Sequence, residues 1–263
     1  MKKDEKMNIT YGPVSSWRLG KSLGVDLICS KEKICSFDCV YCQLGKTHNK
    51  TTERCSYISI DKLKKEIGRS LEETSPDVIT FSGTGEPTLA KNIDKAIIET
   101  KKITNIPLAI LTNSTLMNNK SVQKALLKLD IVVAKLDASN EKLFQEINKP
   151  AEGVKFQETF EGIKNFKEKF SGKLDIQTMF IKTNMNFAEE IADAVCEIKP
   201  DEIQINTPLR PCPVKPLSKK QIDIIENIFK EKGLKTISVY KSTKPKTSPM
   251  DKIEIFKRRG IYK

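Results

Sequence analysis

The segment DVITFSGTGEPT, residues 77–88, passes from an apolar run directly into a polar, glycine-rich one. Its first half is rich in β-branched and aromatic residues, which is typical of a strand. Its second half places two glycines and a glutamate at the end of that strand. Other apolar runs of the chain are also followed by unusual polar segments. This unit of strand and polar loop is therefore the basis of the predicted fold.

Short apolar runs alternate with segments of helical periodicity. In the first such helix apolar residues recur at Leu63, Ile67 and Leu71, with Asp61 expected as its N-cap and Asn92 as a cap of the next helix. Strands are expected at residues 22–28, 77–82, 106–112, 130–137, 173–182 and 202–207. Helices are expected at residues 61–74, 92–103, 119–129, 156–170, 187–199 and 218–233.

This alternation predicts an α/β fold with a parallel sheet, because parallel strands are joined by right-handed helical crossovers. Six units are too few for a closed eight-unit barrel, so a partial (β/α)6 barrel and an open doubly wound sheet both fit. Residues 235–239 can add an edge strand. We expect a single domain at residues 20–233, with an N-terminal segment at 1–19 and a basic C-terminal extension at 234–263.

Composition excludes some classes of protein. The chain has 263 residues, of which 38% are hydrophobic and 30% charged, enough to bury a full core. No apolar run reaches the length of a membrane helix, and the charged N-terminus lacks a signal-peptide core. A cytoplasmic location is expected. Seven cysteines in such a chain favour a metal or redox site over a disulfide framework.

The net charge of +12 is unevenly distributed, since residues 241–263 carry a net +6. A clustered basic tail indicates contact with a polyanion such as RNA. The alternative, that lysines simply solvate the surface, stays open at this point.

The polar segments that follow the strands predict where the functional face lies. They are SGTGEPT (82–88), TNST (112–115), KLDAS (135–139), IKTNMN (181–186) and NTPLRPCP (206–213). Any one of them is ordinary loop composition, but chemistry in parallel α/β folds lies at the carboxyl ends of strands. Their common position indicates an enzyme. In the first segment, Gly83 and Gly85 would let the backbone approach a ligand, and Glu86 offers a carboxylate to an ammonium group.

A cysteine cluster, CSFDCVYC at residues 35–42, follows the first predicted strand. Three thiolates can bind zinc or an iron–sulfur cluster. A structural zinc ion would need a fourth ligand from His48, Cys29 or Cys55, and no second Cys-x-x-Cys exists. Three cysteines on a four-iron cluster leave one iron with an open coordination site, which is the arrangement of a catalytic cluster.

Together, CSFDCVYC and SGTGEPT resemble the signature motifs of the radical S-adenosylmethionine (SAM) superfamily. The segments LTNST and KLDAS and the strand order resemble its partial (β/α)6 TIM-type barrel over about residues 20–210. The wider run YGPVSSWRLGKSLGVDLI is similar to a group of these proteins related to tRNA wyosine-base enzymes.

The resemblance implies that Cys35, Cys39 and Cys42 ligate a [4Fe-4S] cluster and that SAM chelates the fourth iron. A reductant such as flavodoxin or ferredoxin would supply an electron. SAM would then be cleaved to methionine and a 5′-deoxyadenosyl radical, which abstracts hydrogen from a substrate. The cofactors perform the chemistry, and the protein positions them and the substrate and excludes water.

The resemblance also implies the SAM contacts. Tyr41 would lie against the adenine, the glycine-rich segment would hold the methionyl amine, and Asp137 would bind the ribose hydroxyls. The expected cofactor-binding residues are Tyr41, Ser82, Gly83, Gly85, Glu86, Asn113 and Asp137. From their positions at strand ends, the substrate candidates are Lys135, Lys182, Asn206 and Arg210.

The substrate expected from the motif and the basic tail is RNA, with tRNA modification as the activity. A peptide or protein substrate, or a non-catalytic RNA-binding protein with a zinc knuckle, are the alternatives. The wyosine reaction itself is not transferred, because only Cys29 precedes the motif, whereas wyosine enzymes use additional cysteines there. The cysteines without an assigned role are Cys29, Cys55, Cys196 and Cys212.

Overall fold

A computed structural model of the chain describes residues 7–258 and contains one eight-stranded sheet in the order β1-β2-β3-β4-β5-β6-β7-β8. The strands β1 and β2 pair in antiparallel fashion, and every later neighbour is parallel. The strands are β1 Thr10–Ser16, β2 Gly20–Val25, β3 Val78–Phe81, β4 Leu108–Thr112, β5 Ile131–Lys135, β6 Lys173–Met179, β7 Glu202–Asn206 and β8 Thr236–Ser238.

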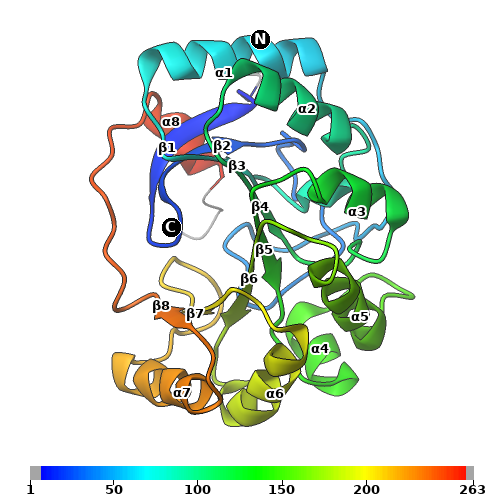
Figure 1. Ribbon diagram of the computed structural model, residues 1–263, viewed down its shortest axis with the longest axis vertical. Helices are drawn as coiled ribbons and strands as arrows, with labels where there is room; N and C mark the ends of the chain where they lie inside the picture. Colours follow the sequence, from blue (N-terminus) through cyan, green and yellow to red (C-terminus); the bar gives the residue numbers. More distant parts are fainter. Residues whose placement is uncertain (1–6, 259–263) are drawn as a thin grey trace.

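Except for the short last helix, the helices lie outside the curled sheet, on its convex face (Figure 1). The α-helices are α1 Ile60–Glu73, α2 Ile93–Ile103, α3 Lys120–Leu126, α4 Glu141–Asn148, α5 Phe156–Lys167, α6 Ala188–Ile198, α7 Lys219–Glu231 and α8 Lys252–Lys257, with 3-10 turns η1 Pro87–Leu89 and η2 Met185–Phe187. The partial barrel is confirmed, with β2 to β7 as the six predicted strands and β8 as a further parallel strand at the edge. The doubly wound alternative is wrong, because it would need helices on both faces of the sheet.

Some local predictions need correction. Ser59, not Asp61, caps α1, because its side chain accepts the backbone N–H of Lys62. Asn92 precedes α2 but makes no side-chain cap, and its amide donates to the carbonyl of Ile58 instead. The helix α4 and the strand β1 were not expected. The sheet also includes β1 and β8, so it extends beyond residues 20–233, and the proposed domain boundaries stay predictions.

Alternation along the strands separates an apolar outer layer from a polar interior. On β6, Leu174 and Ile176 are fully buried in the apolar core. The intervening Asp175 and Gln177 lie on the other face, where Gln204 of β7 donates to Asp175 over 2.9 Å. Successive strand residues point to opposite faces, so the concave face of the half-barrel is polar along β6 and β7. On β4 and β5 the same face also presents Leu111 and Val133.

The barrel does not close between β8 and β1, and a C-terminal strap, residues 239–258, runs between these two strands (Figure 1). The hydroxyl of Ser15 donates to the carbonyl of Pro245 over 2.6 Å, and the N–H of Met250 donates to the carbonyl of Gly12 over 2.9 Å. The strap ends in α8, which packs on β1. Most of the basic extension is therefore docked on the barrel, and its residues 259–263 lie outside the described part of the chain.

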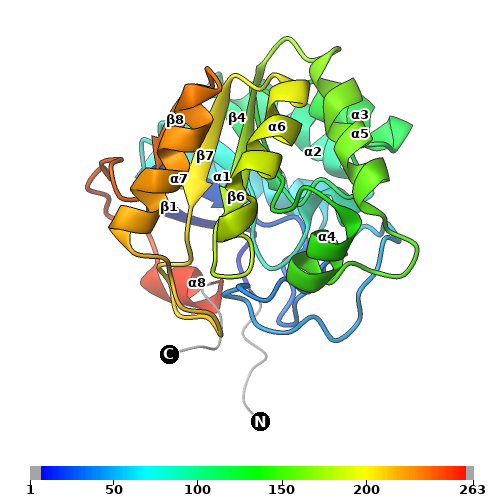
Figure 2. The ribbon, with the colours of Figure 1, turned by 90° about the horizontal axis from the view of Figure 1, so that it is seen from below.

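The carboxyl ends of the parallel strands form the mouth of the barrel. In Figure 2 the loop between β2 and α1, together with α4 and α8, lies at this end. Across residues 7–258, no helix is long and apolar enough to span a membrane. The polar loops predicted from the sequence therefore meet at one end of the sheet, as expected for an α/β enzyme.

Replacing Phe229 with Ala tests the apolar layer. Phe229 is fully buried and packs edge-to-face on Phe180, with ring centroids 5.9 Å apart. The cavity left by its ring should lower the free energy of unfolding by about 3–5 kcal/mol. Phe256→Ala is the matched control, because Phe256 is 66% exposed and should change stability by less than about 0.5 kcal/mol. Urea denaturation measures both, and equal losses would contradict the assignment of the core.

Candidate active site

The cysteine loop, residues 26–59 between β2 and α1, is joined to the segment Ser82–Glu86, which we call the glutamate loop. The N–H of Glu86 donates to the carbonyl of Ile34 over 3.0 Å, and the N–H of Ile34 donates to the carbonyl of Thr84 over 3.3 Å. Ile34 and Gly85 thereby form a parallel bridge. Since Cys35 follows Ile34 directly, this junction fixes the first cysteine beside Glu86.

Amide donors surround the buried sulfur atoms. The side-chain amide of Asn113 lies 3.5 Å from Sγ of Cys35, and that of Asn148 lies 3.5 Å from Sγ of Cys39. The N–H of Phe37 is a further donor to Cys35, at 3.4 Å. Such donors stabilise thiolates and cluster ligands more than thiols.

Burial affects the protonation of the same sulfur atoms. It raises the pKa of Cys39 to about 11, with the nearby Asp137 charge adding to the shift, and it raises the pKa of Cys35 further. A thiol of this kind is protonated at neutral pH, so binding of iron has to displace its proton. The buried side chain of Lys33 lies beside the three cysteines and adds a positive charge that favours thiolates.

This donor set fits an iron–sulfur cluster better than a zinc ion. Among the described residues, no three His, Cys, Asp or Glu side chains are close enough to hold one metal ion. His48 and Cys55 are exposed, and the thiol of Cys29 lies 3.5 Å from the carbonyls of Met7 and Asn8. Each thiolate of a four-iron cluster binds its own iron, so wider spacing is expected than around zinc.

A cavity of about 170 Å³ is lined on one side by Cys35 and Cys42 and on the other by the polar loops that follow β3 and β4. Its lining includes Lys33, Cys35, Cys42, Gly85, Glu86, Asn113, Lys135 and Gln177. A larger hollow of about 700 Å³ lies at the other end of the strands, near Asp130 and Gly172, and contains none of the polar loops. We therefore place the site in the smaller cavity, at the mouth.

Glu86 is a fixed carboxylate on the cavity wall. One oxygen, Oε1, accepts the hydroxyl of Thr112 over 2.7 Å and both the N–H and hydroxyl of Thr88 over 3.1 and 2.7 Å. The other, Oε2, accepts the N–H of Asn113 over 2.7 Å. Burial raises the pKa of Glu86, and these hydrogen bonds oppose the shift. These four donors hold the Glu86 carboxylate in place, and its contact with a methionyl ammonium stays a prediction.

The two glycines of the glutamate loop allow close packing within the protein. A Cβ on Gly85 would lie 1.7 Å from the carbonyl oxygen of Ile34, and one on Gly83 would lie 2.1 Å from Cγ of Asp26. The sequence predicted that they allow a ligand to approach. In the structure, the close neighbours are the cysteine loop and a buried carboxylate.

Tyr41 and Asp137 form a buried group behind the cavity. The Tyr41 hydroxyl donates to Asp137, which also accepts the amide of Asn148 and the N–H of Met179, each over 2.8 Å. Nζ of Lys135 lies 3.5 Å from Asp137 and 4.9 Å from the centre of the Tyr41 ring. Both oxygens of Asp137 therefore have protein partners, and its contact with a ribose stays a prediction.

The remaining predicted residues are distributed around the mouth. The hydroxyls of Ser82 and Tyr11 are 2.9 Å apart. Asn206 is buried and accepts the N–H of Thr207, whereas Lys182 is exposed, and neither lines the cavity. Arg210 donates to Gln43 over 2.9 Å and so links the β7–α7 loop to the cysteine loop.

Sequence inspection missed four polar residues of the site, namely Lys33, Gln177, Asn148 and Asp26. Lys33 and Gln177 line the cavity, Asn148 donates to Cys39, and Asp26 packs under Gly83. Alternation along β6 could have indicated Gln177. No local signal marks Asn148, because α4 itself was not predicted.

The profile of the Radical SAM superfamily matches residues 33–195, which include all three cysteines and the glutamate loop. The chain belongs to the radical SAM superfamily. It is also 38% identical over 205 residues to a UPF0026 protein of Synechocystis sp., covering 78% of this chain and 77% of that relative. The superfamily match supports its assignment as an enzyme and makes a [4Fe-4S] cluster and SAM its cofactors.

Solved structures confirm the fold. SuiB of Streptococcus suis bound to S-adenosylmethionine superposes with a TM-score of 0.59 at 19% identity, over 84% of this chain and 47% of SuiB. Archaeal TYW1 superposes with a TM-score of 0.53 at 14% identity, over 80% of this chain and 71% of TYW1. This chain thus spans about half of SuiB. The zinc-knuckle alternative is wrong, because the chain is a radical SAM enzyme.

Substituting Gly85 with Ala tests the junction between the two loops. The added Cβ overlaps the Ile34 carbonyl, which is backbone and cannot rotate away. We expect a loss of about 1–3 kcal/mol in unfolding free energy and a lower iron content after anaerobic reconstitution.

Gly68→Ala in α1 is the control, because a Cβ there meets no atom within 4 Å. It should retain full iron content and wild-type or higher stability. Normal iron binding and stability in the Gly85 variant would contradict the junction.

Proposed function

We propose that this radical SAM enzyme modifies RNA, with tRNA as the substrate class. The observation that carries the proposal is a set of exposed lysines on three separate loops at the mouth: Lys46, Lys182 and Lys215. None of them ion-pairs with a carboxylate of the described residues. Unpaired cations around a polar cavity favour a polyanion whose backbone lies across the mouth while one unit enters the cavity.

The C-terminal extension contributes less free charge than its composition indicates. Lys241 is paired with Glu226 and Asp223 at 2.7 and 3.0 Å, and Arg258 is paired with Asp26 at 2.9 Å. Among its described residues, the exposed lysines that form no ion pair are Lys244, Lys246 and Lys252. The main contact with RNA is therefore assigned to the mouth, and the strap is a secondary one.

The residues of the cavity would have separate roles. When bound, the cluster and SAM supply a 5′-deoxyadenosyl radical that abstracts a hydrogen atom from the substrate. Cys35, Cys39 and Cys42 would hold the cluster. Glu86 would bind the methionyl ammonium of SAM by a charge-assisted hydrogen bond.

Other residues of the cavity would orient the cofactor and substrate. Asn113, which donates to Ser36 over 2.8 Å, would hold the cysteine loop against the SAM site. Lys135 and Gln177, 3.4 Å apart on adjacent strands, would contact a polar group of the substrate. The buried walls of the cavity exclude water from the reacting atoms.

Radical SAM enzymes need a one-electron reductant, and flavodoxin or ferredoxin is the proposed donor. Electron transfer requires only a transient contact near the cysteine loop. The exposed Lys46 of that loop suits an acidic donor protein, since complementary charge accelerates association.

Replacing Glu86 with Gln should weaken SAM binding. The change retains the shape but removes the charge facing the ammonium, so the Kd for SAM should rise about tenfold. Iron content should stay normal because no sulfur ligand is changed. Equilibrium dialysis of cluster-loaded protein measures the Kd. Wild-type affinity in the variant would exclude Glu86 as a SAM ligand.

A triple variant, Lys46→Ala, Lys182→Ala and Lys215→Ala, tests the RNA interface. Its affinity for tRNA should fall at low salt, and the slope of log K against log salt should flatten by about two to three, since each phosphate contact contributes about one. The control removes three exposed lysines from the outside of the barrel: Lys65 on α1, Lys124 on α3 and Lys169 in the turn after α5. Equal losses in the two triple variants would contradict a specific interface at the mouth.

The corresponding cellular experiment compares modified nucleosides in a deletion strain with its parent. Loss of one modified nucleoside, restored by the wild-type gene and not by Cys39→Ala, would support the proposal. Cys196→Ala, on α6 and away from the cavity, should restore it. An unchanged RNA profile would overturn the RNA substrate in favour of a peptide or protein.

A further inference from the structure

Arg258, directly after α8, is buried at the mouth against the opposite end of the chain. It is 4% exposed, and its Nε lies 2.9 Å from Oδ2 of Asp26. Its Nη1 donates to the side chain and carbonyl of Glu254 over 2.8 and 3.0 Å, and its Nη2 donates to the carbonyl of Asn8. The guanidinium also lies over the ring of Tyr11, 4.6 Å from its centre.

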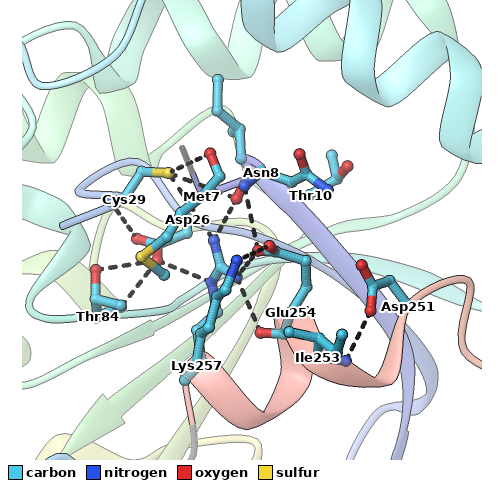
Figure 3. A network of polar contacts seen from close by, with 12 residues as sticks. Met7, Asn8, Thr10, Asp26, Cys29, Thr84, Asp251, Ile253, Glu254 and Lys257 are labelled. Atoms are coloured by element: carbon cyan, nitrogen blue, oxygen red, sulfur yellow. Dashed lines mark hydrogen bonds and ion pairs between the residues drawn. The ribbon is translucent and has the colours of Figure 1, made fainter. Parts of the chain in front are cut away.

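Asp26 connects this guanidinium to the glutamate loop, and its surroundings with Cys29, Thr84 and Glu254 are shown in Figure 3. Its Oδ2 accepts the N–H and the hydroxyl of Thr84 over 3.1 and 3.0 Å, in addition to Arg258. Its Oδ1 accepts the N–H groups of Ile28 and Cys29 over 3.1 and 2.8 Å. One carboxylate therefore binds the start of the cysteine loop, the middle of the glutamate loop and the C-terminal arginine.

The buried carboxylate of Asp26 under the glutamate loop requires a positive counter-charge. Asp26 is 1% exposed, and a buried carboxylate is costly unless it is paired and hydrogen-bonded. Arg258 is the cation that forms an ion pair with it among the described residues. Loss of this cation would leave the Asp26 carboxylate without a counter-charge beside Thr84, two residues before Glu86.

We propose that Arg258 is a positioning residue for SAM: through Asp26, it holds the glutamate loop in the conformation that presents Glu86 to the cavity. The inference rests on the proposed contact between Glu86 and SAM. The Ser82–Tyr11 hydrogen bond of 2.9 Å supports the start of the same loop, and Arg258 packs on that tyrosine as well. Arg258 itself does not line the cavity, so it acts only through its neighbours.

The test uses the full-length, cluster-loaded protein and the variant Arg258→Met. We expect the Kd for SAM to rise about tenfold, as for loss of a charged hydrogen bond, while iron per chain stays at the wild-type value. Before SAM is added, the amides of Thr84 and Glu86 should exchange with deuterium faster than in the wild type. Arg258→Lys should recover part of the affinity, because it retains the charge but not the fork of donors.

Lys241→Met is the matched control. It also removes a C-terminal cation that ion-pairs with barrel carboxylates, but its partners Glu226 and Asp223 lie on α7. It should lower the melting temperature without changing the Kd for SAM or exchange in the glutamate loop. A Kd that rises equally in both variants would reduce the role of Arg258 to general stability and overturn the proposal.

Thr84→Val provides a second, milder variant that leaves the Arg258–Asp26 pair intact. It removes the hydroxyl that Asp26 holds, so the Kd should rise with little change in iron content. If Arg258 acts through this contact, the double variant Arg258→Met, Thr84→Val should bind SAM no more weakly than whichever single variant has the higher Kd. Additive losses would show that Arg258 acts by another route.

The outcomes separate this inference from the proposed function. If Arg258→Met is folded, carries iron and binds SAM as the wild type does, the positioning role is wrong. If that variant does not fold, unchanged affinity in Thr84→Val overturns the role instead. If the wild type binds SAM and Glu86→Gln has no effect, the proposed SAM contact fails first, and the role of Arg258 fails with it.

Discussion

The site depends on the short backbone bridge between Ile34 and Gly85. It joins the loop that carries the cysteines to the loop that carries Glu86 through main-chain hydrogen bonds alone. No side-chain rotation can therefore change the spacing of the two loops. Cys35, the proposed cluster ligand, and Glu86, the proposed contact of SAM, are therefore fixed relative to each other by backbone geometry. The glycine is required because any Cβ would lie within bonding distance of the Ile34 carbonyl oxygen.

Buried polar contacts then connect this bridge to the rest of the mouth. Glu86 receives donors from η1 and from the end of β4, and Asn113 extends the chain of contacts to Ser36 and Cys35. Buried polar groups are stable only when they have hydrogen-bond partners. Because each loop supplies partners to the next, the loops stabilise one another. The polar side chains of the cavity are thus held in place by several loops at once.

The sequence predicted the parallel barrel, the cysteine motif and the glutamate loop, because each depends on local pattern or spacing. It could not predict the contact of Asn148 with Cys39 or the pairing of Arg258 with Asp26, which join residues 109 and 232 positions apart. The helix α4 was missed because the expected alternation has one helix after each strand, whereas both α4 and α5 lie between β5 and β6. The close packing of Gly83 and Gly85 against protein atoms could not be predicted either, since only coordinates reveal which atoms lie opposite a missing side chain. Their approach to a ligand stays a prediction.

The strap has a consequence for biosynthesis. Asp26 is translated near the start of the chain and Arg258 near the end of the described residues. At about 5–20 residues per second, the carboxylate waits on the order of ten seconds or longer for its counter-charge. Strands β3 to β8 and all three cysteines are synthesised in that interval. A nascent chain that takes up iron then would do so before the glutamate loop is held in place, so binding of SAM would have to follow the synthesis of Arg258.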